Sequence, residues 1–179
     1  LSAFRAESAQ EAHLLKQYKR STKINLDRKD YYLDCFFLSA KLKHYCDALN
    51  YKNILNTDIP IGLIDPLLEA LDQSSYLNEP AILIYYLIMK TLTEPGQSSH
   101  FQELRQALAQ HPSLFPIQEL RDHYIFAQNY CIRKINLGHQ DYLRELFDLY
   151  QIMLNDRIIF ADDELPPTVY KNVITLGLR

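Results

Sequence analysis

Apolar residues recur along most of this chain at spacings of three and four, the period of an amphipathic α-helix. The longest such stretch runs from about Asp27 to Asn50 and is apolar around much of its circumference, which predicts a helix contacted from several sides. Read in this way, the chain predicts about eight helices. They cover residues 3–20, 27–50, 65–73 (or from Pro60), 80–93, 99 to just before Pro112, 116–137, 140–155 and 167–176.

Residues 80–93 are the ambiguous segment of this pattern. Nine consecutive apolar residues, from Ala81 to Met89, would also suit a buried β-strand. No neighbouring segment has the pattern of a partner strand, so we expect a helix here and an all-α fold.

Three helix ends carry recognisable signals. Asp65 and Pro66 fit an N-cap followed by proline at the first helical position. Ser99 and Gln102 have the spacing of a capping box. Gly138 follows a predicted helix and is the natural residue for a left-handed stop.

Two segments of the chain resemble each other at the period of a helical hairpin. Residues 67–73 match residues 104–110 at four of seven positions, with an offset of 37 residues, and a weaker echo relates Phe101 and Leu108 to Tyr142 and Leu149 at an offset of 41. Helical-hairpin repeats have periods of about 33–47 residues. The chain therefore reads as consecutive antiparallel hairpins.

The stretch from Asn129 to Leu146 resembles a tetratricopeptide repeat (TPR). Gly138, Asp141 and Tyr142 occupy the places where that family has a turn glycine, an acidic residue and an aromatic that starts the second helix. The chain has no tryptophan, so the resemblance is to a divergent member. It implies a TPR-like, right-handed α-solenoid segment, with a peptide- or protein-binding surface lined by the first helix of each repeat.

Composition narrows the function classes. A formal net charge of −3 and the lack of a concentrated basic face argue against nucleic-acid binding. No apolar run reaches the roughly 18 residues of a membrane span. The three cysteines are scattered in apolar helical runs, which favours a reducing compartment, and we expect a cytoplasmic protein.

We expect residues 1–179 to form a single helical-repeat domain. The chain lacks an initiator methionine and starts with a polar, charged segment. The apolar residues of the last predicted helix, among them Val169, Val173 and Ile174, have no following segment to cover them. The first feature suggests a fragment, a processed chain or an excised domain. The second suggests that the natural chain continues past Arg179 or that another subunit packs there.

The sequence holds no pattern of a nucleotide loop, a nucleophile elbow or a metal site, so we expect neither a cofactor nor a bound metal. Asp162, Asp163 and Glu164 suit a solvated loop better than a cation site. Asp30 and Asp34 share a helix face, and such pairs are usually exposed charges that pair with a basic residue, here Arg28.

A non-catalytic protein-interaction or scaffolding module is therefore the function that the sequence favours. Its partner would be a protein, a peptide or further repeats of the same chain. One alternative is a regulatory domain that binds a small molecule between helices, and a cavity lined by Tyr85, His123 and Tyr124 would favour it. Another is a helical enzyme whose site has no sequence signature. The candidate partner-binding residues are Arg121, Asn129, Arg133, Lys171 and Asn172. The alternative for each of them is an exposed face or a hydrogen bond between helices.

Overall fold

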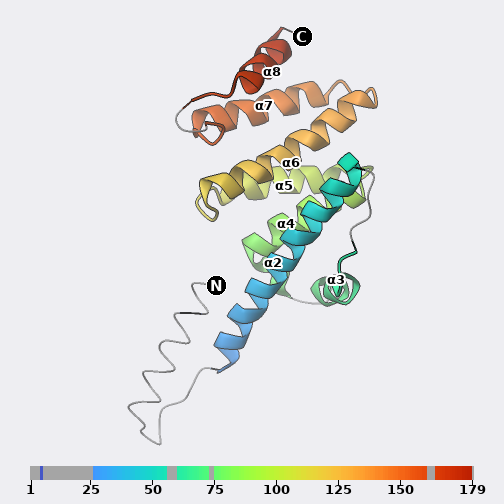
Figure 1. The fold of residues 1–179 in the computed structure, drawn as a ribbon, viewed down its shortest axis with the longest axis vertical. Coiled ribbons are helices and arrows are strands. Elements are labelled where there is room, and N and C mark those ends of the chain that lie inside the picture. Colours follow the sequence, from blue (N-terminus) through green and yellow to red (C-terminus); the bar gives the residue numbers. More distant parts are fainter. Residues whose placement is uncertain (1–4, 6–25, 56–59, 73–74, 161–163, 179) are drawn as a thin grey trace, which may run out of the picture. The chain divides into compact units, whose positions relative to one another are not determined.

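A computed structural model describes residues 5, 26–55, 60–72, 75–160 and 164–178 (Figure 1). Over these residues the fold is all-helical, which confirms the predicted class, and it contains no β-strand. The elements are α2 (Leu26–Leu55), α3 (Ile64–Asp72), the 3-10 helix η1 (Ser75–Asn78), α4 (Pro80–Thr93), α5 (Ser98–Gln110), α6 (Ile117–Asn136), α7 (Tyr142–Asn155) and α8 (Pro167–Gly177). The helix predicted over residues 3–20 lies outside the described residues, Arg5 excepted.

The ambiguous segment 80–93 is a helix over its whole predicted length. The start of α3 differs from the prediction, because the helix begins at Ile64 and includes Asp65 and Pro66 in its first turn. Proline is tolerated there since the first four N–H groups of a helix have no intrahelical acceptor. The chain enters α3 through Leu63, which adopts a positive φ of 64° although it is not glycine.

The capping box predicted at Ser99 and Gln102 does not form. Helix α5 begins one residue earlier, at Ser98, and its N-cap residue is Gln97, which makes no capping hydrogen bond through its side chain. Ser99 therefore lies within the first helical turn. A capping side chain comes from the residue before that turn, so the Ser99 hydroxyl is not placed to cap the helix.

Gly138 ends α6 as predicted. Its φ is 97°, in the region that favours glycine, and its N–H bonds the carbonyl of Ile135 at 2.9 Å. The next N–H, that of His139, bonds the carbonyl of Lys134 at 3.0 Å. These two bonds form a Schellman motif, which satisfies carbonyls at the helix end and directs the chain back toward α7.

The chain divides into two compact units, residues 1–86 and 87–179, and the division falls inside the uninterrupted helix α4. The single domain expected over residues 1–179 therefore remains a prediction, and the units are described separately. None of the described helices is both long enough and apolar enough to cross a bilayer.

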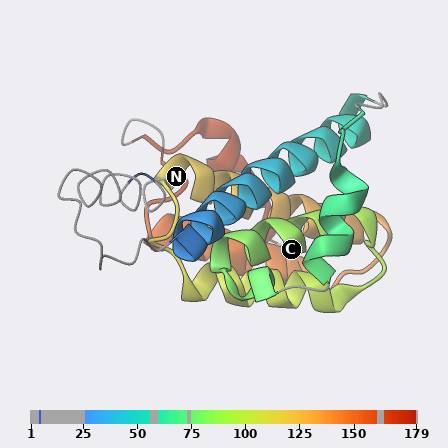
Figure 2. The ribbon, with the colours of Figure 1, turned by 90° about the horizontal axis from the view of Figure 1, so that it is seen from below.

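In the first unit, α3 runs back from the C-terminal end of α2 and packs against it (Figure 2). Leu42 and Cys46 of α2 and Leu71 of α3 are fully buried. The Cys46 thiol donates to the backbone carbonyl of Tyr85 in α4 at 3.3 Å. This contact joins the long helix to the N-terminal half of α4, and the buried thiol serves packing.

In the second unit, α5, α6, α7 and α8 lie in chain order, and each packs against the next (Figure 1). Three aromatic rings of its core, one from each of α5, α6 and α7, contact one another. Phe101 stacks on Tyr130 with 4.9 Å between ring centroids, and Tyr142 lies 5.9 Å from Phe101 and 5.8 Å from Tyr130. All three residues are buried.

Helix α8 differs from the other helices of this unit because none of its residues is buried. Val169, Val173 and Leu176 are half-buried, whereas Tyr170 and Ile174 are 60% and 47% exposed. Helix α8 is thus not fully covered by the part of the chain that the structure describes.

Candidate functional site

A pocket of about 350 Å³ lies between α2, α3 and η1 in the first unit. Its size falls at the lower end of the range of small-molecule sites, about 300–1,000 Å³. Helix α2 contributes Phe37 and Leu38, and α3 contributes Leu67, Ala70 and Leu71 among others. The described residues of the lining are apolar except for Asp34 and Tyr76.

The spacing of the α3 residues explains why they share one wall. Leu67, Ala70 and Leu71 follow each other at intervals of three and one, so they lie on one side of the helix. Leu67 and Leu71 are buried and form the inner part of this wall. Leu63, the positive-φ residue before α3, also lines the pocket and is 67% exposed.

One phenol–carboxylate pair forms the polar end of the pocket, and a second pair lies beside it. The Tyr76 hydroxyl donates to Asp34 Oδ2 at 2.5 Å, and the Tyr31 hydroxyl donates to Glu79 Oε1. The rings of Tyr31 and Tyr76 stack with 5.5 Å between centroids and 21° between planes. We call Tyr31, Asp34, Tyr76 and Glu79 the phenol–carboxylate cluster; it ties α2 to η1 and to the residue that precedes α4.

The carboxylates hold the two phenols in their protonated state. The hydrogen bond to Asp34, together with burial, raises the pKa of Tyr76 to about 12. The hydrogen bond to Glu79 likewise raises the pKa of Tyr31 above its ordinary value. Burial raises the pKa of the neighbouring Cys35 thiol, so this cysteine lacks the thiolate character of a nucleophile. None of these three groups is tuned for proton transfer near neutral pH.

The Tyr76 hydroxyl is expected to ionise near pH 12 in the folded protein. Its pKa is raised above the ordinary 10.0, so its stabilising contribution is complete below pH 10 and is lost as the pH rises toward 12. The measurement is the tyrosinate absorbance titration of the wild type minus that of Tyr76→Phe. Asp34→Asn is the matched variant and should move this transition back toward 10. A difference curve that titrates near 10 in the wild type would contradict the expectation.

Two of the predicted partner-binding residues make hydrogen bonds to backbone carbonyls of this chain. Arg121 of α6 donates from Nε to the carbonyl of Ile158 at 2.7 Å and from Nη2 to the carbonyl of Phe160. Arg133 of the same helix is half-buried and reaches the carbonyl of Thr91 at 3.5 Å. Burial lowers the pKa of its guanidinium. The two arginines thus serve different ends of α6, one toward the segment after α7 and one toward α4.

The other three predicted residues are more accessible to a partner. Asn129 is half-buried on α6, while Lys171 and Asn172 are exposed neighbours on α8. The Asn172 amide donates to the Tyr150 hydroxyl at 3.4 Å, a contact between α8 and α7. The participation of all five residues in partner binding stays a prediction.

The sequence did not predict the pocket between α2 and α3. Tyr85, His123 and Tyr124, the lining expected of a small-molecule cavity, are all buried, and none of them lines this pocket. Asp34 was expected to be a solvated helix charge, yet it accepts the Tyr76 hydroxyl from 42 residues away. The sequence signal for this site is that acidic residues and tyrosines occur close together in the chain within residues 30–79.

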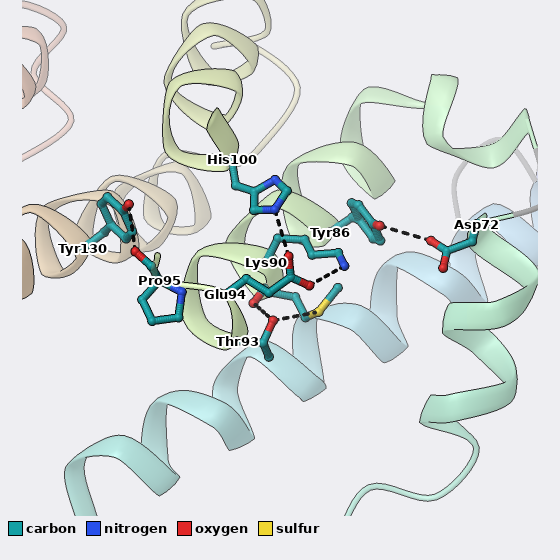
Figure 3. Close-up of polar contacts among 9 residues, drawn as sticks. Asp72, Tyr86, Lys90, Thr93, Glu94, Pro95, His100 and Tyr130 are labelled. Atoms are coloured by element: carbon teal, nitrogen blue, oxygen red, sulfur yellow. Dashed lines mark hydrogen bonds and ion pairs between the residues drawn. The ribbon is translucent and has the colours of Figure 1, made fainter. Parts of the chain in front are cut away.

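A second group of polar residues lies at the turn between α4 and α5 (Figure 3). Glu94 pairs with Lys90 at 2.7 Å and with His100 at 3.1 Å. The hydrogen bonds from Lys90 and His100 lower the pKa of the Glu94 carboxyl. Glu94 is an exposed residue, so these pairs contribute little stability and chiefly fix the turn. The Tyr130 hydroxyl bonds the carbonyl of Pro95 in the same turn at 3.2 Å.

Comparisons with protein-family models, curated proteins and solved structures find no match to this chain.

Proposed function

We propose that this chain is a non-catalytic protein-interaction or scaffolding module, built as a divergent TPR-like stack of helical hairpins in a right-handed α-solenoid. The packing order of the second unit supports this proposal, because each helix from α5 to α7 packs against the next in the chain. Stacked repeats leave a last helix with one apolar face that only another element can cover.

The observation that carries the proposal is the outer face of α8. Tyr170, Ile174 and Leu178 follow each other at intervals of four residues, so they lie on one side of the helix and its C-terminal end. Their exposed fractions are 60%, 47% and 83%. A row of large exposed apolar side chains is typical of a surface that binds another protein.

Lys171 adds a positive charge beside this apolar face. It is the charged residue of α8, it is exposed, and it lies next to Tyr170. The partner that fits is an apolar helix or segment with an acceptor or a carboxylate opposite Lys171, which includes further repeats of the same chain.

Ile174→Asp is expected to abolish partner capture, since a buried carboxylate at the centre of the face would be desolvated without a counter-ion. The matched control is Leu114→Asp in the α5–α6 connection, because Leu114 is 46% exposed and Ile174 is 47% exposed. The wild type and both variants would be immobilised equally, and proteins captured from an extract of the source cells would be quantified.

Proteins retained by the wild type and by Leu114→Asp should fall about tenfold or more with Ile174→Asp, the effect of losing a central interface residue. Equal recovery by Ile174→Asp, or the lack of any protein retained by the wild type, would refute the proposal.

The second candidate function is a regulatory domain that binds a small molecule. The pocket between α2 and α3 favours it, because an apolar cavity with two polar groups at one end is the usual form of a ligand site. Stabilisation of the protein by a ligand would distinguish this function from protein binding.

A further inference from the structure

We propose that the pocket between α2 and α3 binds a small organic cation, an apolar body carrying an amine that pairs with the Asp34 carboxylate. This inference rests on the second candidate function and names its class of ligand.

The apolar body follows from the walls of the pocket. Leu38, Leu67 and Leu71 are buried and form an apolar interior, whereas Phe37 is 46% exposed beside them. A ligand in the pocket would cover Phe37 and exchange water for apolar contacts, which is the main source of affinity in such sites. The volume of about 350 Å³ suits a compact body, such as one aromatic ring with a short aliphatic chain.

The positive charge follows from the polar end. Among the described residues that line the pocket there is one carboxylate, Asp34, and no basic side chain. A carboxylate has about four acceptor positions, and the Tyr76 hydroxyl takes one of them at Oδ2. Asp34 can therefore accept a further charge-assisted hydrogen bond from a ligand ammonium group.

Two further carboxylates lie near the pair formed by Asp34 and Tyr76. Glu79 belongs to the phenol–carboxylate cluster, and Asp30 is near enough to Tyr76 to affect its hydroxyl. An anionic ligand would be repelled by these carboxylates, whereas a cation would be attracted.

The test uses three probes with the same apolar body: phenylbutylamine, phenylbutanol and phenylbutanoate. Calorimetric titration of the whole chain gives each dissociation constant. The amine should bind about fivefold or more tightly than the alcohol, as expected for a partly exposed charge-assisted pair. The carboxylate probe should bind most weakly because it faces Asp34.

Two pairs of variants locate the site. Asp34→Asn should remove the preference for the amine over the alcohol, while Asp30→Asn, one turn earlier on α2, should have a smaller effect. Ala70→Phe places a ring in the pocket and should abolish binding of all three probes. Ala109→Phe is its control, because Ala109 is an exposed alanine of α5 that does not line the pocket. Circular dichroism would establish that each variant is folded.

Equal affinities for amine and alcohol, or amine binding that Asp34→Asn leaves unchanged, would overturn the cationic ligand class while the pocket remained a ligand site. Failure of all three probes, or binding that survives Ala70→Phe, would overturn the pocket itself and with it the second candidate function. Protein binding is tested separately, through Ile174, and partner capture should be unaffected by Asp34→Asn.

Discussion

Phe101→Ala is expected to lower the free energy of unfolding of the second unit by about 3–5 kcal/mol, the range for removing a fully buried phenylalanine. The Phe101 ring is completely buried, and it contacts rings from both α6 and α7. Its removal leaves a cavity where three helices meet and also removes two aromatic pairs. Urea denaturation followed by circular dichroism gives the loss of stability, and amide exchange of α5, α6 and α7 localises it to this unit.

The matched control is Phe36→Ala. Phe36 is 40% exposed on α2, so the same chemical change should cost roughly 1 kcal/mol or less. Phe101→Leu, which keeps most of the buried volume, should fall between the two. A Phe101→Ala protein as stable as Phe36→Ala would mean that the aromatic contact among α5, α6 and α7 does not hold these helices together.

The inner residues of α5 and α7 were predictable because helical periodicity is a local property of the sequence. The wide apolar circumference of α2 did not predict burial, since Leu33, Phe36 and Phe37 are 43%, 40% and 46% exposed. In α7 the spacing of the apolar positions places Tyr142, Leu146, Leu149, Tyr150 and Met153 on the inner side, and all five are buried. The same holds for Phe101, Leu104, Ala107 and Leu108 of α5. Each pattern repeats over several turns, so no single residue decides it.

Helix ends were less predictable because one or two residues decide them. Gly138 gave a reliable signal, since glycine is favoured at its φ of 97°. Leu63 gave no such signal, because a leucine at a φ of 64° is uncommon and the neighbouring residues in the sequence do not indicate it. The chain therefore enters α3 earlier than the Asp65–Pro66 pair suggests.

The candidate site could not be read from the sequence because its contacts join residues far apart in the chain. Asp34 meets Tyr76 across 42 residues, and Arg121 meets Ile158 across 37. From the pattern of its own helix, each of Asp34 and Arg121 looks like a polar residue on an exposed face. Only the folded chain shows that Asp34 lines a pocket and that Arg121 bonds backbone carbonyls.

The chemistry of the two candidate surfaces is different, and each lies within one unit. The pocket of the first unit combines apolar walls with Asp34, and the outer face of α8 in the second combines apolar side chains with Lys171. One is concave and acidic, suited to a small cation. The other is an exposed apolar row, suited to a macromolecular partner. A variant of one surface therefore leaves the other intact, and the two functions can be tested independently.

Arg121→Met is expected to destabilise the connection between α7 and α8 by about 2–3 kcal/mol, the range for hydrogen bonds that involve a charged donor. The Arg121 guanidinium donates to the carbonyls of Ile158 and Phe160, just after the end of α7. Methionine keeps much of the aliphatic volume but leaves both carbonyls without this donor. Urea denaturation measures the loss, and faster amide exchange in residues 157–160 and in α8 locates it.

Arg144→Met is the control, because Arg144 is exposed on α7 and its replacement should change stability by less than about 0.5 kcal/mol. Unchanged exchange in Arg121→Met would show that these bonds do not hold the connection. Faster exchange has a consequence for function as well. Charge reversal at Arg121 would then weaken partner binding by loosening the connection to α8, even if Arg121 never touches the partner. Its role in binding can be judged only from variants whose α8 exchanges at the wild-type rate.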